Sequence, residues 1–344
     1  MSEQEPQGKK DILSNNQKDL ALFVLLLFVI PAISAVGIVG NFCSILVLSK
    51  QNLKKCSNIL LLGLAVSDLS SLFGINNIPR IIYTVFGKDS FPYSHYSSVI
   101  LFIVSEICLI IDYSSCLISL TLPMLITIER LITVFFPLKV SSIITPRRTF
   151  VSVLGVFVFW YGNFIYAIFW FELHDEFQIS ENRTVYVIIR SALFKSDRDV
   201  VFKIEEVWAY MSMRIPAVFT FLGCIVIGIK IKFASVKRRQ LTGKQTNESM
   251  NRTTKTLLAV CGMYMIACAI TSLPVSLPQY VSYSISEETT TNICEVTYHL
   301  LDSVLCVNSS CNFVIYIIFN KNFREAYRAL FIRGSKVNMT RRKH

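Results

Sequence analysis

Seven long apolar stretches, separated by polar or charged connectors, constrain this chain more than any other feature of its sequence. A helix needs about 20 predominantly apolar residues to cross the hydrocarbon core of a bilayer, and each stretch reaches that length. The chain is 53% hydrophobic and 17% charged, whereas soluble domains are about a quarter charged. We therefore expect an all-α membrane protein, a bundle of seven transmembrane helices in the lipid bilayer. The predicted spans are 22–48, 58–83, 99–133, 150–171, 207–229, 257–284 and 295–319.

Lysine and arginine are distributed unevenly among the connectors, and this asymmetry predicts the orientation of the chain. Connectors 49–57, 134–149, 230–256 and 320–344 together carry 22 Lys and Arg against two acids, and the other set carries 9 against fifteen. Because basic connectors stay in the cytoplasm, we expect a multi-pass plasma-membrane protein with an extracellular N-terminus, residues 1–21, and a cytoplasmic C-terminus. The net charge of +11 then belongs to the inner membrane face and an intracellular partner, so we expect no nucleic-acid partner.

Three further signals lie outside the spans. After the last span, apolar residues recur at helical spacing while lysine and arginine lie off that stripe. This pattern predicts a short amphipathic helix over 320–332 on the inner leaflet, followed by a basic cytoplasmic tail, 333–344. The sequon Asn182-Arg183-Thr184 lies in an outer connector, so Asn182 is a candidate glycosylation site.

Nothing in the sequence forms a constellation for catalysis or for a structural metal. The four histidines are scattered, and no Cys/His cluster has zinc spacing. The acids within the spans are not arranged as a facing aspartate pair. We therefore expect that the protein is not an enzyme.

Nine ionisable residues lie within the predicted spans, and each is a functional candidate because a charge in lipid is costly. They are Asp68, Arg80, Glu106, Asp112, Glu129, Arg130, Arg214, Glu295 and Asp302. The adjacent Glu129 and Arg130 end the third span, where acid and base can hold one another in one state and the arginine can turn to a partner in another. The alternative is an arginine that simply snorkels at a helix end.

Short motifs occur in order along the spans, and together they carry a family resemblance. They are Gly40-Asn41, Leu64-Ala65-Val66-Ser67-Asp68, Glu129-Arg130-Leu131, Pro216, Pro274 and Asn312-Phe313-Val314-Ile315-Tyr316. In this order the chain resembles the rhodopsin-type (class A) G-protein-coupled receptors over about residues 20–332. Two stretches, 136–148 and 308–313, are similar more narrowly to divergent invertebrate chemosensory and FMRFamide-type peptide receptors.

The resemblance implies a cell-surface receptor that passes an extracellular signal, from a neuropeptide or small cationic ligand, to heterotrimeric G proteins. The alternative is a seven-span transporter or ligand-gated channel. That alternative predicts inverted repeats or a polar stripe through a span, and the sequence has neither. The seventh span contains no lysine, so retinal has no attachment point there and no cofactor is expected beyond an allosteric sodium ion.

The sodium site implied by the resemblance is centred on Asp68. The positions that match the family's other sodium-pocket residues, with Asn41 adjoining, are Ser119, Asn308, Ser309 and Asn312. Hard oxygen ligands around one carboxylate suit a small cation. The alternative is a purely structural cluster of buried polar groups.

Three acids in the outer half, Asp112, Asp302 and Glu106, form the candidate ligand set. Asp112 matches the position at which amine receptors of the family pair a carboxylate with the ligand ammonium, and Asp302 lies at a comparable depth. Acids around one outer vestibule favour an amine or an Arg-containing peptide, by charge pairing and steering. The alternative for Asp112 is an internal ion pair with Arg80 or Arg214.

The resemblance assigns activation and G-protein coupling to five residues, Glu129, Arg130, Pro216, Pro274 and Tyr316. Arg130 and the basic residues of 230–256 would form the G-protein face when the sixth helix swings outward at its inner end. Pro274 would be the pivot of that movement, or merely a static kink.

The chain departs from the family pattern at several positions. Ser272, Phe313 and Cys224 stand where the family has Trp, Pro and Tyr, so the activation mechanism cannot be transferred in detail. Ser105 stands at the third-span position of the usual disulfide, and the connector 172–206 contains no cysteine. That disulfide cannot form, and the connector must be held in another way.

Overall fold

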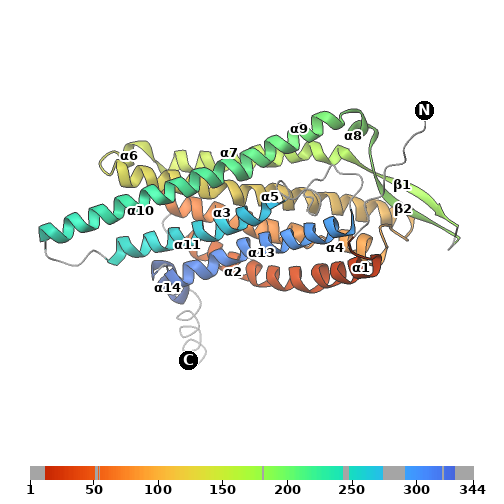
Figure 1. Cartoon of the computed structure of the whole chain (residues 1–344), viewed down its shortest axis with the longest axis horizontal. Helices are drawn as coiled ribbons and strands as arrows, with labels where there is room; N and C mark the ends of the chain where they lie inside the picture. Colours follow the sequence, from red (N-terminus) through yellow and green to blue (C-terminus); the bar gives the residue numbers. More distant parts are fainter. Residues whose placement is uncertain are drawn as a thin grey trace, which may run out of the picture.

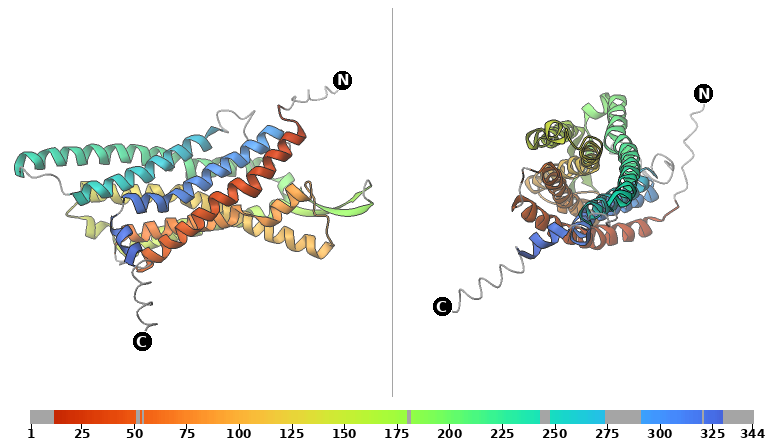
Figure 2. Two further views of the ribbon diagram at one scale, coloured as in Figure 1. Left: turned by 90° about the horizontal axis from the view of Figure 1, so that it is seen from below. Right: turned by 90° about the vertical axis from the view of Figure 1, so that its left-hand side faces the viewer.

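The computed structural model describes residues 12–50, 53, 55–179, 182–242, 248–273, 291–319 and 321–329. They form an elongated bundle whose long helices run roughly along its long axis (Figures 1 and 2). Six helical stretches are long and apolar enough to cross a membrane, and Ala259–Thr271 is a shorter apolar helix. The six are Asn15–Lys50, Cys56–Phe86, His95–Phe135, Pro146–Trp170, Arg198–Phe233 and Asn292–Phe319. The part of the sixth predicted span from Pro274 onward, 274–284, lies outside the described residues.

Several of these stretches consist of successive helices. The α-helices are α1 (Asn15–Val24), α2 (Ile30–Lys50), α3 (Cys56–Ile75), α4 (Ile78–Ile81), α5 (His95–Phe135), α6 (Val140–Ile143), α7 (Pro146–Ile165), α8 (Ala192–Ser196), α9 (Arg198–Ala209), α10 (Ile215–Thr242), α11 (Glu248–Thr271), α13 (Asn292–Phe319) and α14 (Lys321–Arg328). Wider π-helical turns occupy Leu25–Val29, Ile82–Phe86 and Tyr210–Arg214, and a tighter 3-10 turn occupies Tyr166–Trp170.

Hydroxyl side chains begin four of the helices, including α8, which Ser191 caps. Ser14, Ser94 and Thr145 precede α1, α5 and α7, and each accepts a hydrogen bond from the backbone N–H three residues later. Such a cap satisfies one of the N–H groups that have no partner within the helix. Pro146 then occupies the first turn of α7, where its missing N–H costs nothing.

The π-helical turns adjoin prolines. Leu25–Val29 lies just before Pro31, Tyr210–Arg214 lies just before Pro216, and the third π turn follows Pro79. A proline ring collides with the carbonyl four residues earlier, and in the first two cases that carbonyl lies inside the wider turn. The prolines therefore widen these helices locally without ending them.

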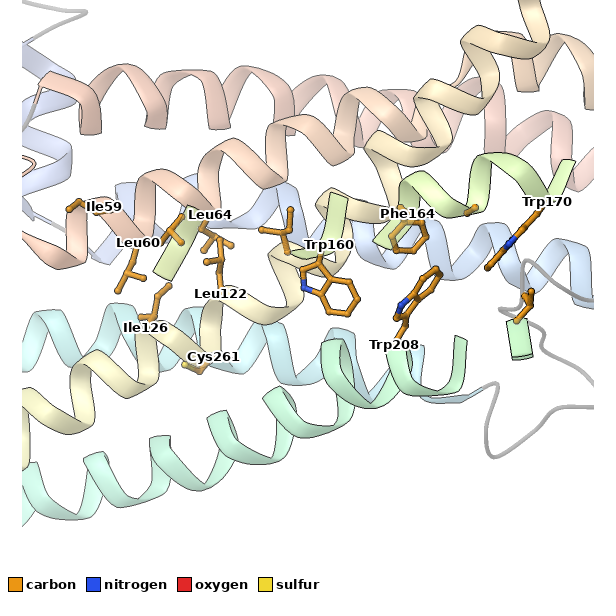
Figure 3. Close-up of a cluster of buried hydrophobic side chains, with 14 of the residues drawn as sticks. Ile59, Leu60, Leu64, Leu122, Ile126, Trp160, Phe164, Trp170, Trp208 and Cys261 are labelled. Carbon is orange, nitrogen blue, oxygen red and sulfur yellow. The ribbon is translucent and has the colours of Figure 1, made fainter. Parts of the chain in front are cut away.

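The largest buried apolar cluster joins α3, α5 and α7 to α9, α10 and α11. Figure 3 shows its aromatic part, in which Trp160, Phe164 and Trp170 follow one another along the bundle and Trp208 lies across from Phe164. The outside of the bundle, in contrast, exposes many large apolar side chains, such as Phe233, which is 71% exposed. A surface of this kind suits contact with lipid rather than water.

The connector after α7 forms an antiparallel hairpin that the sequence did not predict. Strand β1 (Phe171–Gln178) pairs with β2 (Arg183–Arg190), from Phe171 opposite Arg190 to Gln178 opposite Arg183. The hairpin projects from one end of the bundle (Figure 1). We refer to this end as the hairpin end.

Hydrogen bonds hold this hairpin on the bundle. The backbone N–H of Phe91 donates to the carbonyl of Tyr186 at 2.8 Å, and Tyr186 returns a bond of 3.1 Å. The N–H of Ile188 donates to the Tyr83 hydroxyl at 3.1 Å. All ten cysteines are free. These contacts therefore hold the connector in place of the disulfide that rhodopsin-type receptors usually form between the third span and this connector.

Helix α14 lies against the bundle at the end opposite the hairpin (Figure 1). Phe323 is buried against the rings of Phe313 and Tyr316. Arg324 donates from Nη1 to the carbonyls of Ile317 and Ile318 at 3.0 and 3.1 Å. These carbonyls end α13 without partners of their own, so Arg324 both satisfies them and complements the negative end of the helix dipole.

Candidate functional site

A cavity of about 280 Å³ lies at the hairpin end of the bundle and is lined by all three predicted ligand acids. Glu106 and Asp112 come from α5, and Asp302 comes from α13. Residues of the first two membrane-spanning stretches and both ends of the hairpin complete its walls. The volume is at the small end of the range of ligand pockets, so it suits a small molecule or one or two side chains of a peptide.

Asp112 lies at a close approach of α3 and α5. A Cβ atom on Gly74 would lie 2.5 Å from the backbone nitrogen of Asp112, so glycine is what allows this approach. Ser71 Oγ donates to Asp112 Oδ1 at 3.1 Å. The carboxylate is thus held by one hydroxyl from the neighbouring helix.

The alternative role for Asp112, an internal ion pair with an arginine, is not found among the described residues. Arg80 lines the same cavity, and its guanidinium lies over the Tyr83 ring, 5.3 Å from the centroid. Arg214 lies instead over the ring of Tyr210, at 4.1 Å. Neither arginine forms a salt bridge with Asp112 in the part of the chain that the structure describes.

Asp302 has a nearby basic partner, which Asp112 lacks among the described residues. Its Oδ2 lies 3.1 Å from Nδ1 of His299, one helical turn earlier on α13. The hydroxyls of Tyr113 and Tyr298 form a hydrogen bond that joins α5 to α13 beside this pair. All four side chains belong to the cavity lining.

The third acid, Glu106, shares the cavity with two arginines, Arg80 and Arg190. Arg190 ends β2, and its guanidinium lies over the rings of Phe171 and Phe194 at 4.4 and 4.7 Å. The hairpin thus delivers a positive charge to a cavity that is otherwise rich in acids. A ligand here would meet carboxylates from the helices and a guanidinium from the hairpin.

The N-terminal helix closes one side of the cavity by contacting α13. Lys18 Nζ forms an ion pair with Glu295 Oε2 at 3.2 Å, and Glu295 lines the cavity. Asn292 Nδ2 donates to the Leu13 carbonyl and to Asn15 Oδ1, both at 2.9 Å. These contacts tie the beginning of the first helix to the beginning of the last.

The predicted sodium-pocket residues meet in the middle of the bundle. Asp68, which is fully buried, accepts from Ser119 Oγ at 2.5 Å and from Asn312 Nδ2 at 2.7 Å. The hydroxyl of Ser309 also lies against this carboxylate. Asn41 Nδ2 donates to the Ser309 carbonyl at 2.9 Å. Helices α5 and α13 therefore contact the buried acid of α3 directly, and Asn41 of α2 joins the cluster through the Ser309 carbonyl.

Some polar atoms around Asp68 have no hydrogen-bond partner among the described residues. They are Asn41 Oδ1 and the hydroxyl of Tyr316. Asn308 is buried on α13 one turn before Asn312. Buried polar atoms normally satisfy their hydrogen-bonding capacity through protein, water or an ion. The cluster can therefore offer oxygen ligands to a small cation or to water.

Three of the residues predicted for activation, Glu129, Arg130 and Tyr316, lie toward the end of the bundle that carries α14. Arg130 Nε forms an ion pair with Glu129 Oε2 at 3.1 Å, so acid and base do hold one another in this state. Pro216 begins α10 just after a π turn. Tyr316 is buried against Phe323 of α14, and Pro274 lies outside the described residues.

The departures from the family pattern have plain local roles. Ser272 Oγ donates to the carbonyl of Cys268 at 2.6 Å, a bond to its own helix. Cys224 on α10 contacts Cys261 on α11, so a thiol pair occupies the space of the family's tyrosine. Ser105 accepts from Asn77 Nδ2 where the family has a disulfide cysteine.

Asn182 lies between the two strands of the hairpin. It is exposed, and its φ of 49° is left-handed, a conformation that asparagine tolerates better than most residues. The sequon is thus presented at the tip of a projecting hairpin.

Sequence reasoning missed several residues of the cavity. Arg190 counted only as part of a polar connector, and His299, Tyr113 and Tyr298 were not singled out. The spacing of His299 and Asp302, three residues apart on one helix, would have paired them. Nothing in the sequence indicates the Tyr113–Tyr298 contact, because it joins residues 185 positions apart.

Comparisons with known proteins agree with this architecture. The family model of the serpentine-type 7TM GPCR chemoreceptor Srw matches residues 28–334. The FMRFamide receptor of Drosophila melanogaster is 26% identical over 332 residues, which cover 94% of this chain but only 56% of that receptor. The thyrotropin-releasing hormone receptor of Ovis aries is 25% identical over 325 residues, covering 89% and 78% of the two chains. Neuropeptide receptor 15 of Caenorhabditis elegans is 32% identical over 132 residues, 37% of this chain and 35% of that receptor. This chain therefore belongs to the Srw family of serpentine seven-transmembrane G-protein-coupled receptors.

Proposed function

We propose that this receptor binds a cationic peptide or amine in the cavity at the hairpin end and activates a heterotrimeric G protein at the α14 end. Membership of a receptor family decides against the transporter or channel alternative. Relatives named for FMRFamide, for thyrotropin-releasing hormone and for neuropeptides support a peptide over a simple amine. Because the chain spans about half the length of the FMRFamide receptor, the ligand is argued from this cavity's own residues.

The observation that carries the proposal is that Asp112 has no basic partner among the described residues. The other acids of the cavity lie near bases: Asp302 pairs with His299, Glu295 pairs with Lys18, Glu106 shares the lining with Arg80, and Asp89 lies near Lys18 and Arg80. Asp112 has only the hydroxyl of Ser71 among the described residues. A carboxylate inside a membrane protein is costly without a cation, so a ligand ammonium or guanidinium is its natural partner.

The orientation we propose places the hairpin outside the cell and α14 in the cytoplasm. The basic connectors support this choice, because the described helix ends that flank them, such as those of α2, α5 and α10, lie at the end that carries α14. If Asn182 is outside, it carries a glycan, and treatment of the expressed receptor with an N-glycosidase increases its gel mobility. Asn182→Gln abolishes that shift. A wild-type receptor that reaches the surface with no glycan and an N-terminal tag inaccessible on intact cells would reverse the orientation.

Transmission to the G protein would use the centre and the α14 end of the bundle. The Asp68 cluster joins helices α2, α3, α5 and α13, so a cation bound there would favour one packing of these helices. The Glu129–Arg130 pair holds the arginine in the present state. An agonist that binds better to a state in which this pair opens would shift the population toward coupling.

The decisive experiment is a screen of cationic peptides and amines on cells that express the receptor, with calcium and cAMP readouts. For an agonist found in this way, Asp112→Asn should weaken potency by well over tenfold, because a desolvated charge pair is lost. Ser71→Ala is the matched control, because it alters the same contact but keeps the charge, and should cost about tenfold or less. A loss below about twofold in Asp112→Asn, at equal surface expression, would refute the pairing.

A further inference from the structure

A second hollow, of about 480 Å³, opens on the side of the bundle between α7 and α9. Gly162 and Tyr166 line it from the α7 side, and Lys203, Val207 and Trp208 line it from α9. A Cβ atom on Gly162 would meet nothing within 4 Å, so the helix surface is open there. The hollow shares no residue with the ligand cavity described above.

This hollow is a groove with a charged end and an apolar end. Helix α9 carries charged residues from Arg198 to Glu206, and the chain then has no charge from Val207 until Arg214. The stretch Arg198–Phe233 contains 36 residues, or about 54 Å of helix, which exceeds the ~30 Å hydrocarbon core. The first turns of α9 therefore lie at the level of the lipid headgroups, and Val207 lies at the edge of the hydrocarbon.

Lys203 lies at the charged end, one helical turn before Val207. Its side chain is exposed, and in the described part of the chain it forms no ion pair. Val207 is 53% exposed although it lies in an apolar segment. An ammonium above an apolar channel is complementary to a lipid that carries a phosphate above an acyl chain.

We propose that this groove binds one glycerophospholipid of the leaflet at the hairpin end. The acyl chain lies over Gly162 and Trp208, and the phosphate contacts Lys203. Because this side of the bundle faces the membrane, phospholipid is the partner present at high concentration, and the charge of Lys203 selects its phosphate.

The floor of the groove connects the lipid to the core of the receptor. Trp208 packs on Phe164, with ring centroids 4.4 Å apart, and Phe164 stacks on Tyr113 at 5.7 Å. Figure 3 shows the Trp208 and Phe164 rings facing one another between their helices. A lipid that covers Trp208 would therefore stabilise the packing between α7, α9 and α5, and its removal would lower the thermal stability of the receptor.

The test uses the full-length receptor in phosphatidylcholine nanodiscs that contain a small fraction of phosphatidylcholine with a photoreactive acyl chain. After illumination, mass spectrometry maps the labelled peptides. We expect labelling concentrated on the segments around 162–166 and 200–208. Gly162→Leu fills the groove and should reduce this labelling by about fifteenfold, the effect of displacing about two chain methylenes.

Gly155→Leu is the matched control, because it lies on the same helix and a Cβ there also meets nothing within 4 Å. It should keep wild-type labelling. Lys203→Glu should reduce labelling as Gly162→Leu does. In a separate measurement, added phosphatidylcholine should raise the melting temperature of the detergent-solubilised wild type but not that of Gly162→Leu. Equal labelling of wild type and Gly162→Leu, or labelling spread evenly over all lipid-facing helices, would overturn the site. Unchanged labelling in Lys203→Glu would overturn the phosphate contact.

Discussion

Substituting Gly74 by alanine tests whether the close contact between α3 and α5 sets the position of Asp112. A Cβ on residue 74 would lie 2.5 Å from the backbone nitrogen of Asp112, 2.7 Å from its Cα and 2.8 Å from its Cβ. Ordinary contact begins at 3.4 Å, and a backbone atom cannot rotate away as a side chain can. The two helices must therefore separate by about 1 Å, and overpacking of this kind costs about 1–3 kcal/mol.

The measurement is the melting temperature of the purified receptor in detergent, followed by a fluorescent thiol dye or by light scattering. For chains of 150–250 residues, 1 kcal/mol corresponds to about 2–4 °C, so we expect Gly74→Ala to lower the melting temperature by a few degrees. For an agonist that depends on Asp112, potency should also fall, because the carboxylate moves away from Ser71.

Gly155→Ala is the control, since a Cβ there meets nothing within 4 Å. In that variant the higher helix propensity of alanine acts alone, and stability should be unchanged or higher by up to about 1 kcal/mol. The two variants thus have opposite expected signs. Equal stability of Gly74→Ala and Gly155→Ala would refute the close approach of α3 and α5 at Asp112.

Two further predictions concern sodium and reduction. Asp68→Ala should abolish any dependence of agonist affinity on sodium at constant ionic strength, because the described cluster loses its carboxylate. Ser67→Ala is the control: Ser67 is a neighbour whose hydroxyl bonds its own helix, and this variant should keep the sodium dependence. A sodium response that survives in Asp68→Ala would sink the cation site. Dithiothreitol should leave both the melting temperature and agonist affinity unchanged, because all ten cysteines are free. Loss of a structural disulfide would instead lower the stability by about 2–5 kcal/mol. A fall of that size would show that such a disulfide exists.

The buried centre of the receptor was predictable because its residues follow the helical repeat. Asp68, Ser119 and Asn312 stand at fixed distances from short motifs, and regular helices carry those distances into space without distortion. The structure brings these three side chains into direct contact, as their positions implied.

The hairpin was not predicted, although its sequence carried a signal. Residues 184–189 are rich in β-branched and aromatic side chains, which favours a strand. The contacts of the hairpin with Tyr83 and Phe91 could not be predicted, because they depend on how a distant connector folds over the end of the bundle.

The cavity was predictable in its acids but not in its other residues. The presence of Asp112 and Asp302 in one cavity follows from their similar depth along two helices. Arg190 enters only because the hairpin returns to the bundle, and the Tyr113–Tyr298 contact depends on the relative rotation of α5 and α13. Rotations of this kind are altered by wide turns, which a count of residues does not reveal.

The π turn at Tyr210–Arg214 has a consequence for how this chain tolerates lost residues. A wide turn is equivalent to one residue inserted into an α-helix, and each residue of an α-helix turns the chain by about 100°. Deleting Met211 should restore a regular helix and leave Trp208 facing its present neighbours, whereas deleting Val218 should rotate everything before it by about 100°. The segment beside Pro216 can therefore lose one residue while the membrane-spanning stretch Arg198–Phe233 still folds.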